Sequence, residues 1–252
     1  MSISLVDLRI VGRVARLGLA GPHPLHLLDA AMLEAIPLAV ARAMADPAVD
    51  LLVVHGSGRD GRVGPFSAGA DLAGIAAMPV GDAEAHAALG QAATRAVAEA
   101  PVPVLAVVDG PCLGGGLELV LACDIRVATA RAVFGYPAAQ RGLIPAFGGT
   151  RRAPVVLGAS RAAELAYTAR RISADEALAW GMLSAVDPDD DADSLEAAWV
   201  ARLTEGILPG ASRRLKAAFM GAADVSEQAV FKACLEDPRA REALAAFLAG
   251  VR

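Results

Sequence analysis

Residues 109–124 (Asp-Gly-Pro-Cys-Leu-Gly-Gly-Gly-Leu-Glu-Leu-Val-Leu-Ala-Cys-Asp) decide the fold of this chain. They follow an apolar run at 104–108 (VLAVV), which predicts a buried strand, and their own second half, 117–123, predicts a buried helix. A glycine-rich turn between a strand and a helix lets a ligand approach backbone N–H groups closely, and a helix N-terminus adds partial positive charge to those donors. The segment therefore predicts either a binding loop or a tight turn that needs positive φ angles.

Glu118 is the residue of this segment placed to carry chemistry. It lies three residues after Gly115, a spacing that on a helix puts its carboxylate on the same face as the Gly115 N–H. A carboxylate beside donors suited to an oxyanion can act as a general acid or base next to an enolate or a tetrahedral intermediate. The simpler interpretation is a buried polar residue whose hydrogen bonds are satisfied, because leucines and a valine surround it.

A second glycine-containing loop precedes this segment. Residues 66–72 (FSAGADL) follow a short buried strand at 51–54 and a polar loop at 55–65. Neither loop contains the Lys-Ser/Thr pair of a P-loop, and neither has the G-x-G-x-x-G spacing of a dinucleotide-binding turn. Nucleotide phosphates are therefore not predicted as ligands.

The rest of the chain predicts an α/β region followed by helices. The first 20 residues alternate as one or two strands, a further strand is expected at 124–129, and helices are expected at 29–45 and 82–99. After about residue 150 the pattern is helical throughout, with candidates at 160–169, 173–180, 194–206, 210–221, 224–236 and 238–249. Ser173 followed by Glu176 has capping-box spacing. This predicts an α/β domain over residues 1–192 and a helical domain over 193–252, divided near an acidic stretch at 187–193.

Composition argues against several kinds of partner. The 23 Lys and Arg residues stand against 28 Asp and Glu, and the only lysines are Lys216 and Lys232, so no attraction to nucleic acid is expected. The cysteines, Cys112, Cys123 and Cys234, form no CxxC pair and no zinc spacing, which predicts reduced thiols, no metal site and a cytoplasmic location. Charges interrupt the N-terminus, and no run approaches the roughly 20 apolar residues of a membrane span, so neither a signal peptide nor a membrane helix is expected.

Three blocks of the sequence resemble the signature blocks of the enoyl-CoA hydratase/isomerase (crotonase) superfamily. They are 66–72 (FSAGADL), 114–124 (GGGLELVLACD), and 134–137 (FGYP) with 142–152 (GLIPAFGGTRR). Two later segments, 172–183 and 237–247, resemble the start of the family's C-terminal helical part and its last helix. The blocks occur in the family's order and span nearly the whole chain, which makes the resemblance far more specific than a single glycine turn.

This resemblance implies a fold of repeated ββα units in a right-handed spiral, with C-terminal helices that pack homotrimers, often paired into hexamers. It also implies an enzyme whose substrate is an acyl-CoA thioester, with coenzyme A as part of that substrate and no separate cofactor. The two oxyanion-hole N–H groups would come from Ala70 and Gly115, and Glu118 matches the first of the hydratase's two catalytic glutamates. The residues along the substrate and its CoA would be Ala68, Asp71, Leu72 and Gly114.

One position departs from the family's pattern. In hydratases the second glutamate follows the proline of the third block; here that position is Ala138. The nearest polar residues are Gln140 and Arg141, and these two and Tyr136 are the candidates to replace the missing acid. Hydration by two carboxylates that share a water is therefore in doubt. Double-bond isomerisation, decarboxylation of a malonyl-type thioester and thioester hydrolysis need only an oxyanion hole and one base. Two alternatives from other classes are a non-catalytic acyl-CoA-binding homologue and an RNA-binding member, against which the scarcity of lysine argues.

Overall fold

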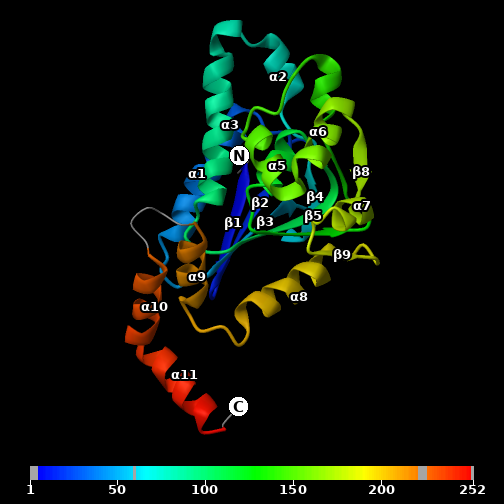
Figure 1. Cartoon of the computed structure of the whole chain (residues 1–252). Coiled ribbons are helices and arrows are strands. Elements are labelled where there is room, and N and C mark those ends of the chain that lie inside the picture. The colour runs from blue at the N-terminus through cyan, green and yellow to red at the C-terminus, as the bar shows by residue number, and fades with distance from the viewer. Residues whose placement is uncertain (1–4, 59–60, 221–225, 251–252) are drawn as a thin grey trace.

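The computed structural model describes residues 5–58, 61–220 and 226–250, and its strands form one nine-stranded sheet surrounded by helices (Figure 1). The strands are β1 (Val6–Val11), β2 (Val14–Leu19), β3 (Leu51–Ser57), β4 (Val63–Ser67), β5 (Val104–Leu113), β6 (Ile125–Thr129), β7 (Val133–Gly135), β8 (Arg171–Ser173) and β9 (Ala185–Asp187). The α-helices are α1 (Ala30–Met44), α2 (Leu72–Ala77), α3 (Ala83–Ala98), α4 (Gly115–Val120), α5 (Gly149–Leu157), α6 (Ala159–Thr168), α7 (Ala174–Ala179), α8 (Ala192–Thr204), α9 (Ala211–Met220), α10 (Glu227–Glu236) and α11 (Pro238–Leu248). Two short 3-10 helices are η2 (Val80–Asp82) and η3 (Pro137–Arg141).

Strand β5 pairs with different strands along its two halves. Its first half pairs in parallel with β3 and β6, and its second half pairs in parallel with β4 and β7. Gly110 lies between the two halves with a φ of +60°, a conformation that glycine adopts without steric cost. The strand pairs β3–β4 and β6–β7 therefore repeat one pattern, in which the first strand pairs with the first half of β5 and the second strand with its second half. The chain thus winds as the spiral of ββα units that the resemblance implies.

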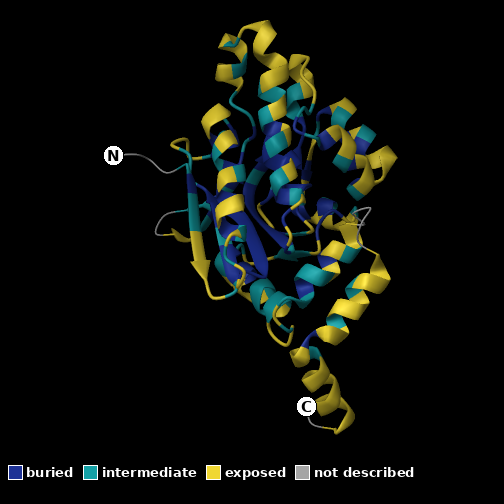
Figure 2. Ribbon diagram, turned by 90° about the vertical axis from the view of Figure 1, so that its left-hand side faces the viewer, coloured by how far each residue is buried: buried dark blue, intermediate teal, exposed yellow. Residues whose placement is uncertain are grey.

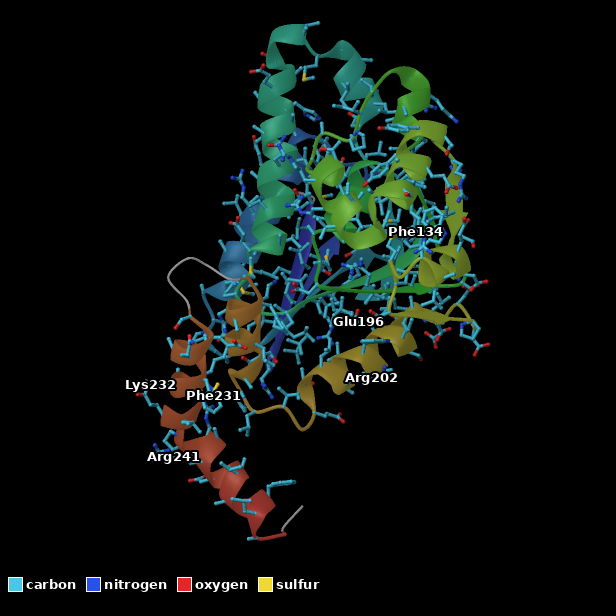
Figure 3. The ribbon with its side chains drawn as sticks, viewed as in Figure 1. Phe134, Glu196, Arg202, Phe231, Lys232 and Arg241 are labelled. Carbon is cyan, nitrogen blue, oxygen red and sulfur yellow. The ribbon has the colours of Figure 1, made fainter. Side chains whose placement is uncertain are left out.

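The central strands are buried on both faces, as Figure 2 shows. On β3, Leu52 and Val54 belong to the core that contains α1 and α3, whereas Leu51 and Val53 belong to a second core covered by α8. Neighbouring residues thus point to opposite faces, which is why a short uncharged run forms this strand. Helix α8 is further tied to the sheet by Glu196, whose Oε1 accepts a hydrogen bond from Arg16 Nε at 2.5 Å (Figure 3).

Parts of the predicted secondary structure are wrong. The chain after residue 150 is not helical throughout, because β8 and β9 return to the sheet beside β7 and β6. Each of these strands has three residues, too few to show an alternating pattern, so tertiary pairing decides their conformation. The strand predicted at 104–108 continues to Leu113, because β4 and β7 offer partners to a segment rich in glycine and proline. The helix predicted at 117–123 is α4, which begins at Gly115 and ends at Val120.

The C-terminal quarter of the chain begins at α8. The boundary predicted after residue 192 falls at the start of this helix, which packs on the sheet, and the division into two domains stays a prediction. Ser173 caps α7 as predicted, since its Oγ accepts a hydrogen bond from the Glu176 N–H at 3.2 Å. The predicted helix limits at 221 and 224 lie outside the described residues. Among the helices of the described segments, none combines the length and apolar character that a membrane crossing requires.

Helices α10 and α11 project away from the α/β body (Figure 1), and neither contains a buried residue. Phe231 on α10, labelled in Figure 3, is 65% exposed, and Phe247 on α11 is 75% exposed. Apolar surface of this kind on extended helices is stable in water only when a partner covers it. We propose that other copies of the chain cover these helices in a homotrimer or hexamer.

We expect the wild-type protein to sediment as a trimer or hexamer at micromolar concentration. Replacing both Phe231 and Phe247 by Asp should shift the protein to smaller species, because a charge in an apolar interface is not compensated. Val80→Asp is the matched control, since Val80 is 91% exposed on η2, far from the C-terminal helices. A wild-type monomer in analytical ultracentrifugation contradicts the proposal.

Candidate active site

The two glycine-containing loops lie against each other through their backbones. Gly69 has a φ of +96°, and a Cβ at this position would lie 2.5 Å from the carbonyl oxygen of Leu113 and 3.1 Å from the nitrogen of Gly115. A Cβ on Gly116 would lie 2.7 Å from the carbonyl oxygen of Ser67. Real Cβ atoms do not approach backbone so closely, so glycine at both positions is a condition for the contact between the loops.

This contact leaves two backbone N–H groups without an acceptor. Leu28 holds the first loop, because its N–H donates to Gly69 O at 2.9 Å and its carbonyl oxygen accepts from the Asp71 N–H at 3.3 Å. In the part of the chain that the structure describes, the N–H groups of Ala70 and Gly115 make no hydrogen bond. Two unpaired donors in facing loops are suited to stabilising an oxyanion.

A cavity of about 230 Å³ lies beside these donors. The predicted site residues in its wall are Ala68, Ala70, Leu72, Gly114, Gly115, Glu118 and Ala138. Asp71 lies outside the wall; its carboxylate accepts a hydrogen bond from the Ala73 N–H at 3.1 Å and caps α2. Apolar residues such as Ile75, Met78 and Ile144 make up much of the remaining wall. A largely apolar cavity with a few polar groups is typical of a site for a small organic ligand.

Glu118 is 2% exposed and lies on the first turn of α4. Its Oε1 accepts two backbone hydrogen bonds, from the N–H of Phe147 and from the N–H of Gly149, each at 2.7 Å. Glycine is required at 149 as well, because a Cβ there would lie 2.8 Å from Oε1. Both of these bonds go to Oε1, and a backbone hydrogen bond from Ala146 also stabilises the carboxylate.

Burial raises the pKa of Glu118 to about 7, because a charge is poorly solvated in this position. The hydrogen bonds from Gly149 and Phe147 and the positive charge of Arg152 oppose this increase, since they stabilise the carboxylate. A carboxyl group with a pKa near neutrality is available as both acid and base, which general acid–base catalysis requires. The predicted spacing of Gly115 and Glu118 thus places the carboxyl beside the free donors in one cavity.

The sequence assigned no role to the cavity residues Phe147 and His86, and it named Tyr136 only as one of three candidates to replace the missing acid. The Phe147 ring fills the space above Gly90 and Gly115, whose missing side chains it would overlap, and it packs edge-on against His86 at 5.7 Å between ring centroids. Tyr136, within the third signature block, is buried beside Glu118. These contacts join separate elements, so no local sequence pattern reveals them.

The two polar residues nearest Ala138 differ in position. Arg141 reaches the cavity wall, but its Nη1 donates to the carbonyl oxygen of Pro137 at 3.2 Å and its side chain is exposed. Gln140 is exposed and is not part of the wall. Neither residue supplies a carboxylate at position 138, where the family's second glutamate is expected and this chain has alanine.

We expect Glu118→Gln to be more stable than the wild type at pH 8. The raised pKa means that folding favours the neutral carboxyl, so this contribution to stability is complete below about pH 4.5 and is lost as the pH rises through about 7. Glutamine stays neutral and keeps an oxygen acceptor. The difference in unfolding free energy should be about 3 kcal/mol at pH 8 and close to zero at pH 4.5. Urea unfolding of both proteins at pH 8 and pH 4.5 measures this difference, and Glu99→Gln on the surface is the control. If Glu118→Gln and the wild type are equally stable at both pH values, the pKa of Glu118 is not raised.

The chain matches the family model described as enoyl-CoA hydratase/isomerase over residues 9–238. It is 40% identical over 174 residues to a crotonyl-CoA hydratase of Syntrophomonas wolfei subsp. wolfei, a match that spans 69% of this chain and 65% of that protein. It is 34% identical over 197 residues to a probable enoyl-CoA hydratase of Bacillus subtilis, spanning 78% of this chain and 74% of that protein.

A solved structure agrees over almost the whole chain. The crystal structure of an enoyl-CoA hydratase from Bacillus anthracis has a TM-score of 0.86 to this structure at 29% sequence identity, and the match covers 98% of this chain and 96% of that chain. The resemblance of the three blocks is therefore confirmed, as is the crotonase-like α/β fold with its helical C-terminal region. The chain belongs to the enoyl-CoA hydratase/isomerase family.

Proposed function

We propose that this protein is an enzyme that converts an acyl-CoA thioester through an enolate. One observation carries the proposal: the free N–H groups of Ala70 and Gly115 and the carboxyl of Glu118 belong to residues that line the same cavity. The thioester oxygen accepts hydrogen bonds from both N–H groups, and Glu118 exchanges a proton with the acyl chain. The names of the relatives, a crotonyl-CoA hydratase and a probable enoyl-CoA hydratase, support this substrate class.

The cavity supplies a place for each part of such a substrate. The acyl group lies against the apolar wall that includes Ile75, Met78 and Phe147. The CoA portion follows the loop of Ala68, Asp71 and Leu72 toward solvent, with Gly114 beside the thioester. In this proposal the chemistry needs no metal and no cofactor other than the coenzyme A that the substrate carries.

Double-bond isomerisation is the reaction that one carboxylate serves best. Glu118 removes a proton from the carbon between the thioester and the double bond of a 3-enoyl-CoA, and the electron pair moves onto the thioester oxygen held by the two N–H groups. The resulting dienolate takes up a proton at its far carbon, which gives the conjugated 2-enoyl-CoA and restores the carboxylate. Stabilisation by a pair of such donors is substantial, because removing one typically costs about 10²–10³ in rate.

Hydration is the second candidate, and the names of the relatives favour it. Addition of water needs one group to take its proton and another to deliver a proton to the α-carbon. Ala138 offers no carboxylate for this second task. We therefore expect hydration to be slower than isomerisation. Decarboxylation, thioester hydrolysis and binding without turnover are the other outcomes that a panel of thioesters distinguishes.

The setting that we propose for this reaction follows from composition. The net charge of −5 and the two lysines lead us to expect no nucleic-acid partner. The lack of a long apolar run and the scattered cysteines lead us to expect no membrane partner and a cytoplasmic location. In the proposed trimer or hexamer, each chain carries its own Glu118 and both of its own oxyanion donors.

The wild type should isomerise 3-hexenoyl-CoA with a rate that rises with pH through about 7, because Glu118 must be ionised to act as base. Glu118→Gln should lower kcat by about 10²–10⁴-fold. Its affinity for the product should change little, because glutamine is nearly isosteric. Stopped-flow absorbance of the conjugated product measures the rate, and calorimetry measures the affinity.

Ala138→Glu tests the departure from the family's pattern in the same assays. It should increase hydration of crotonyl-CoA by about 10²-fold or more, since a second carboxylate can share the water with Glu118. Gln140→Glu is the matched control, because residue 140 is exposed outside the cavity and its new charge should leave hydration unchanged.

Unchanged turnover in Glu118→Gln contradicts the proposed role of Glu118. Tight binding without any turnover across the panel indicates a non-catalytic homologue.

A further inference from the structure

The hydroxyl of Tyr136 is a buried polar group that the proposed function does not use. Tyr136 is 2% exposed, and among the described residues its hydroxyl has no hydrogen-bond partner. Leaving such a group unpaired costs about 1–3 kcal/mol, so its retention in a native protein requires an explanation, such as a bound water, a ligand or a catalytic role. Phenylalanine would fill the same space without this cost.

The hydroxyl lies beside the carboxyl of Glu118. A Cβ on Gly149 would lie 2.8 Å from Glu118 Oε1 and also 2.8 Å from Tyr136 Oη. The Gly149 N–H itself donates to that Oε1 at 2.7 Å. The carboxyl and the phenol therefore meet on the side of Gly149 that has no side chain, and both residues form part of the wall of the same cavity.

The backbone around Tyr136 fixes this position relative to the oxyanion donors. Gly135, the preceding residue, accepts a hydrogen bond at its carbonyl oxygen from the Gly114 N–H at 2.9 Å. Two residues after Tyr136, Ala138 lies in the cavity wall where the family's second glutamate is expected. The hydroxyl thus belongs to the segment from which the missing proton-transfer group would come.

The environment keeps the phenol in its neutral form. Burial raises the pKa of Tyr136 well above its ordinary value, and the nearby charge of Glu118 adds to the increase. A neutral phenol donates a proton and, next to a basic carbanion, acts as a general acid. It cannot act as the base near neutral pH, so this task remains with Glu118.

We propose that Tyr136 is the second proton-transfer residue of the site, in place of a carboxylate at position 138. Glu118 takes the proton from the α-carbon of a 3-enoyl-CoA, and the dienolate forms on the thioester oxygen. The Tyr136 O–H bond then breaks as its proton bonds to the far carbon of the dienolate, which leaves a phenolate. The proton on Glu118 passes to that phenolate, so both residues return to their starting forms. This inference rests on the proposed enolate chemistry.

A single-turnover isomerisation in D₂O tests the assignment. Enzyme equilibrated in D₂O carries deuterium on Tyr136 but none on the ionised Glu118. With 3-hexenoyl-CoA as limiting substrate, the wild-type product should contain one deuterium at the far carbon. Tyr136→Phe should lower the rate by about 10²-fold and give a product that retains the substrate's own hydrogen, because Glu118 then makes both transfers. Mass spectrometry and NMR of the product measure the label.

Tyr167→Phe is the matched control, since Tyr167 is the only other tyrosine and is 87% exposed. Tyr136→Phe should raise the thermal stability, because it removes a buried hydroxyl that has no partner in the described structure, and it should leave the product affinity unchanged. A wild-type rate in Tyr136→Phe, or one deuterium in its product, overturns the inference. If Glu118→Gln is inactive in the same experiment, the proposed function survives that result. Isomerisation that persists in Glu118→Gln rejects both.

Discussion

The structure depends on the direct approach of two backbone segments, the loop around Gly69 and the start of α4 at Gly115. Side chains at Gly69 or Gly116 would separate these segments, because their Cβ atoms would overlap the backbone opposite. Strand β5 makes the approach possible because its second half leaves β3 and β6 and pairs with β4 and β7. This brings Cys112 beside Ser67 of β4 and Leu113 beside Gly135 of β7. The unpaired N–H groups are a consequence of this contact and not of any particular side chain.

The same contact explains why Glu118 is both buried and restrained. Helix α4 begins at the loop contact, so its first turn carries the carboxyl into the interior beneath the free donors. Backbone N–H groups of Phe147 and Gly149 hold one carboxyl oxygen, while burial keeps its pKa near 7. A carboxylate in this position destabilises the folded chain at neutral pH. Such a cost is common where a residue is kept for chemistry at the expense of stability.

Local patterns predicted the parts of the site that are local. The glycines of both loops and the spacing of Gly115 and Glu118 indicate backbone donors beside a carboxyl, because each feature lies within one strand-to-helix turn. The contact between Gly69 and Gly115, by contrast, joins residues far apart in the chain, and only the resemblance to a family indicated it. The three-residue strands β8 and β9 and the position of the Phe147 ring also depend on distant partners, so periodicity could not predict them.

In the mechanism that we propose, the N–H groups of Ala70 and Gly115 together bind the carbonyl oxygen of a thioester. A crystal structure of the protein with butyryl-CoA, which has no double bond to move, tests this most directly. We expect the thioester oxygen to lie about 2.7–3.1 Å from both nitrogen atoms, with the α-carbon facing the Glu118 carboxyl. A thioester oxygen that contacts neither nitrogen, or an acyl group bound outside the cavity, would contradict it.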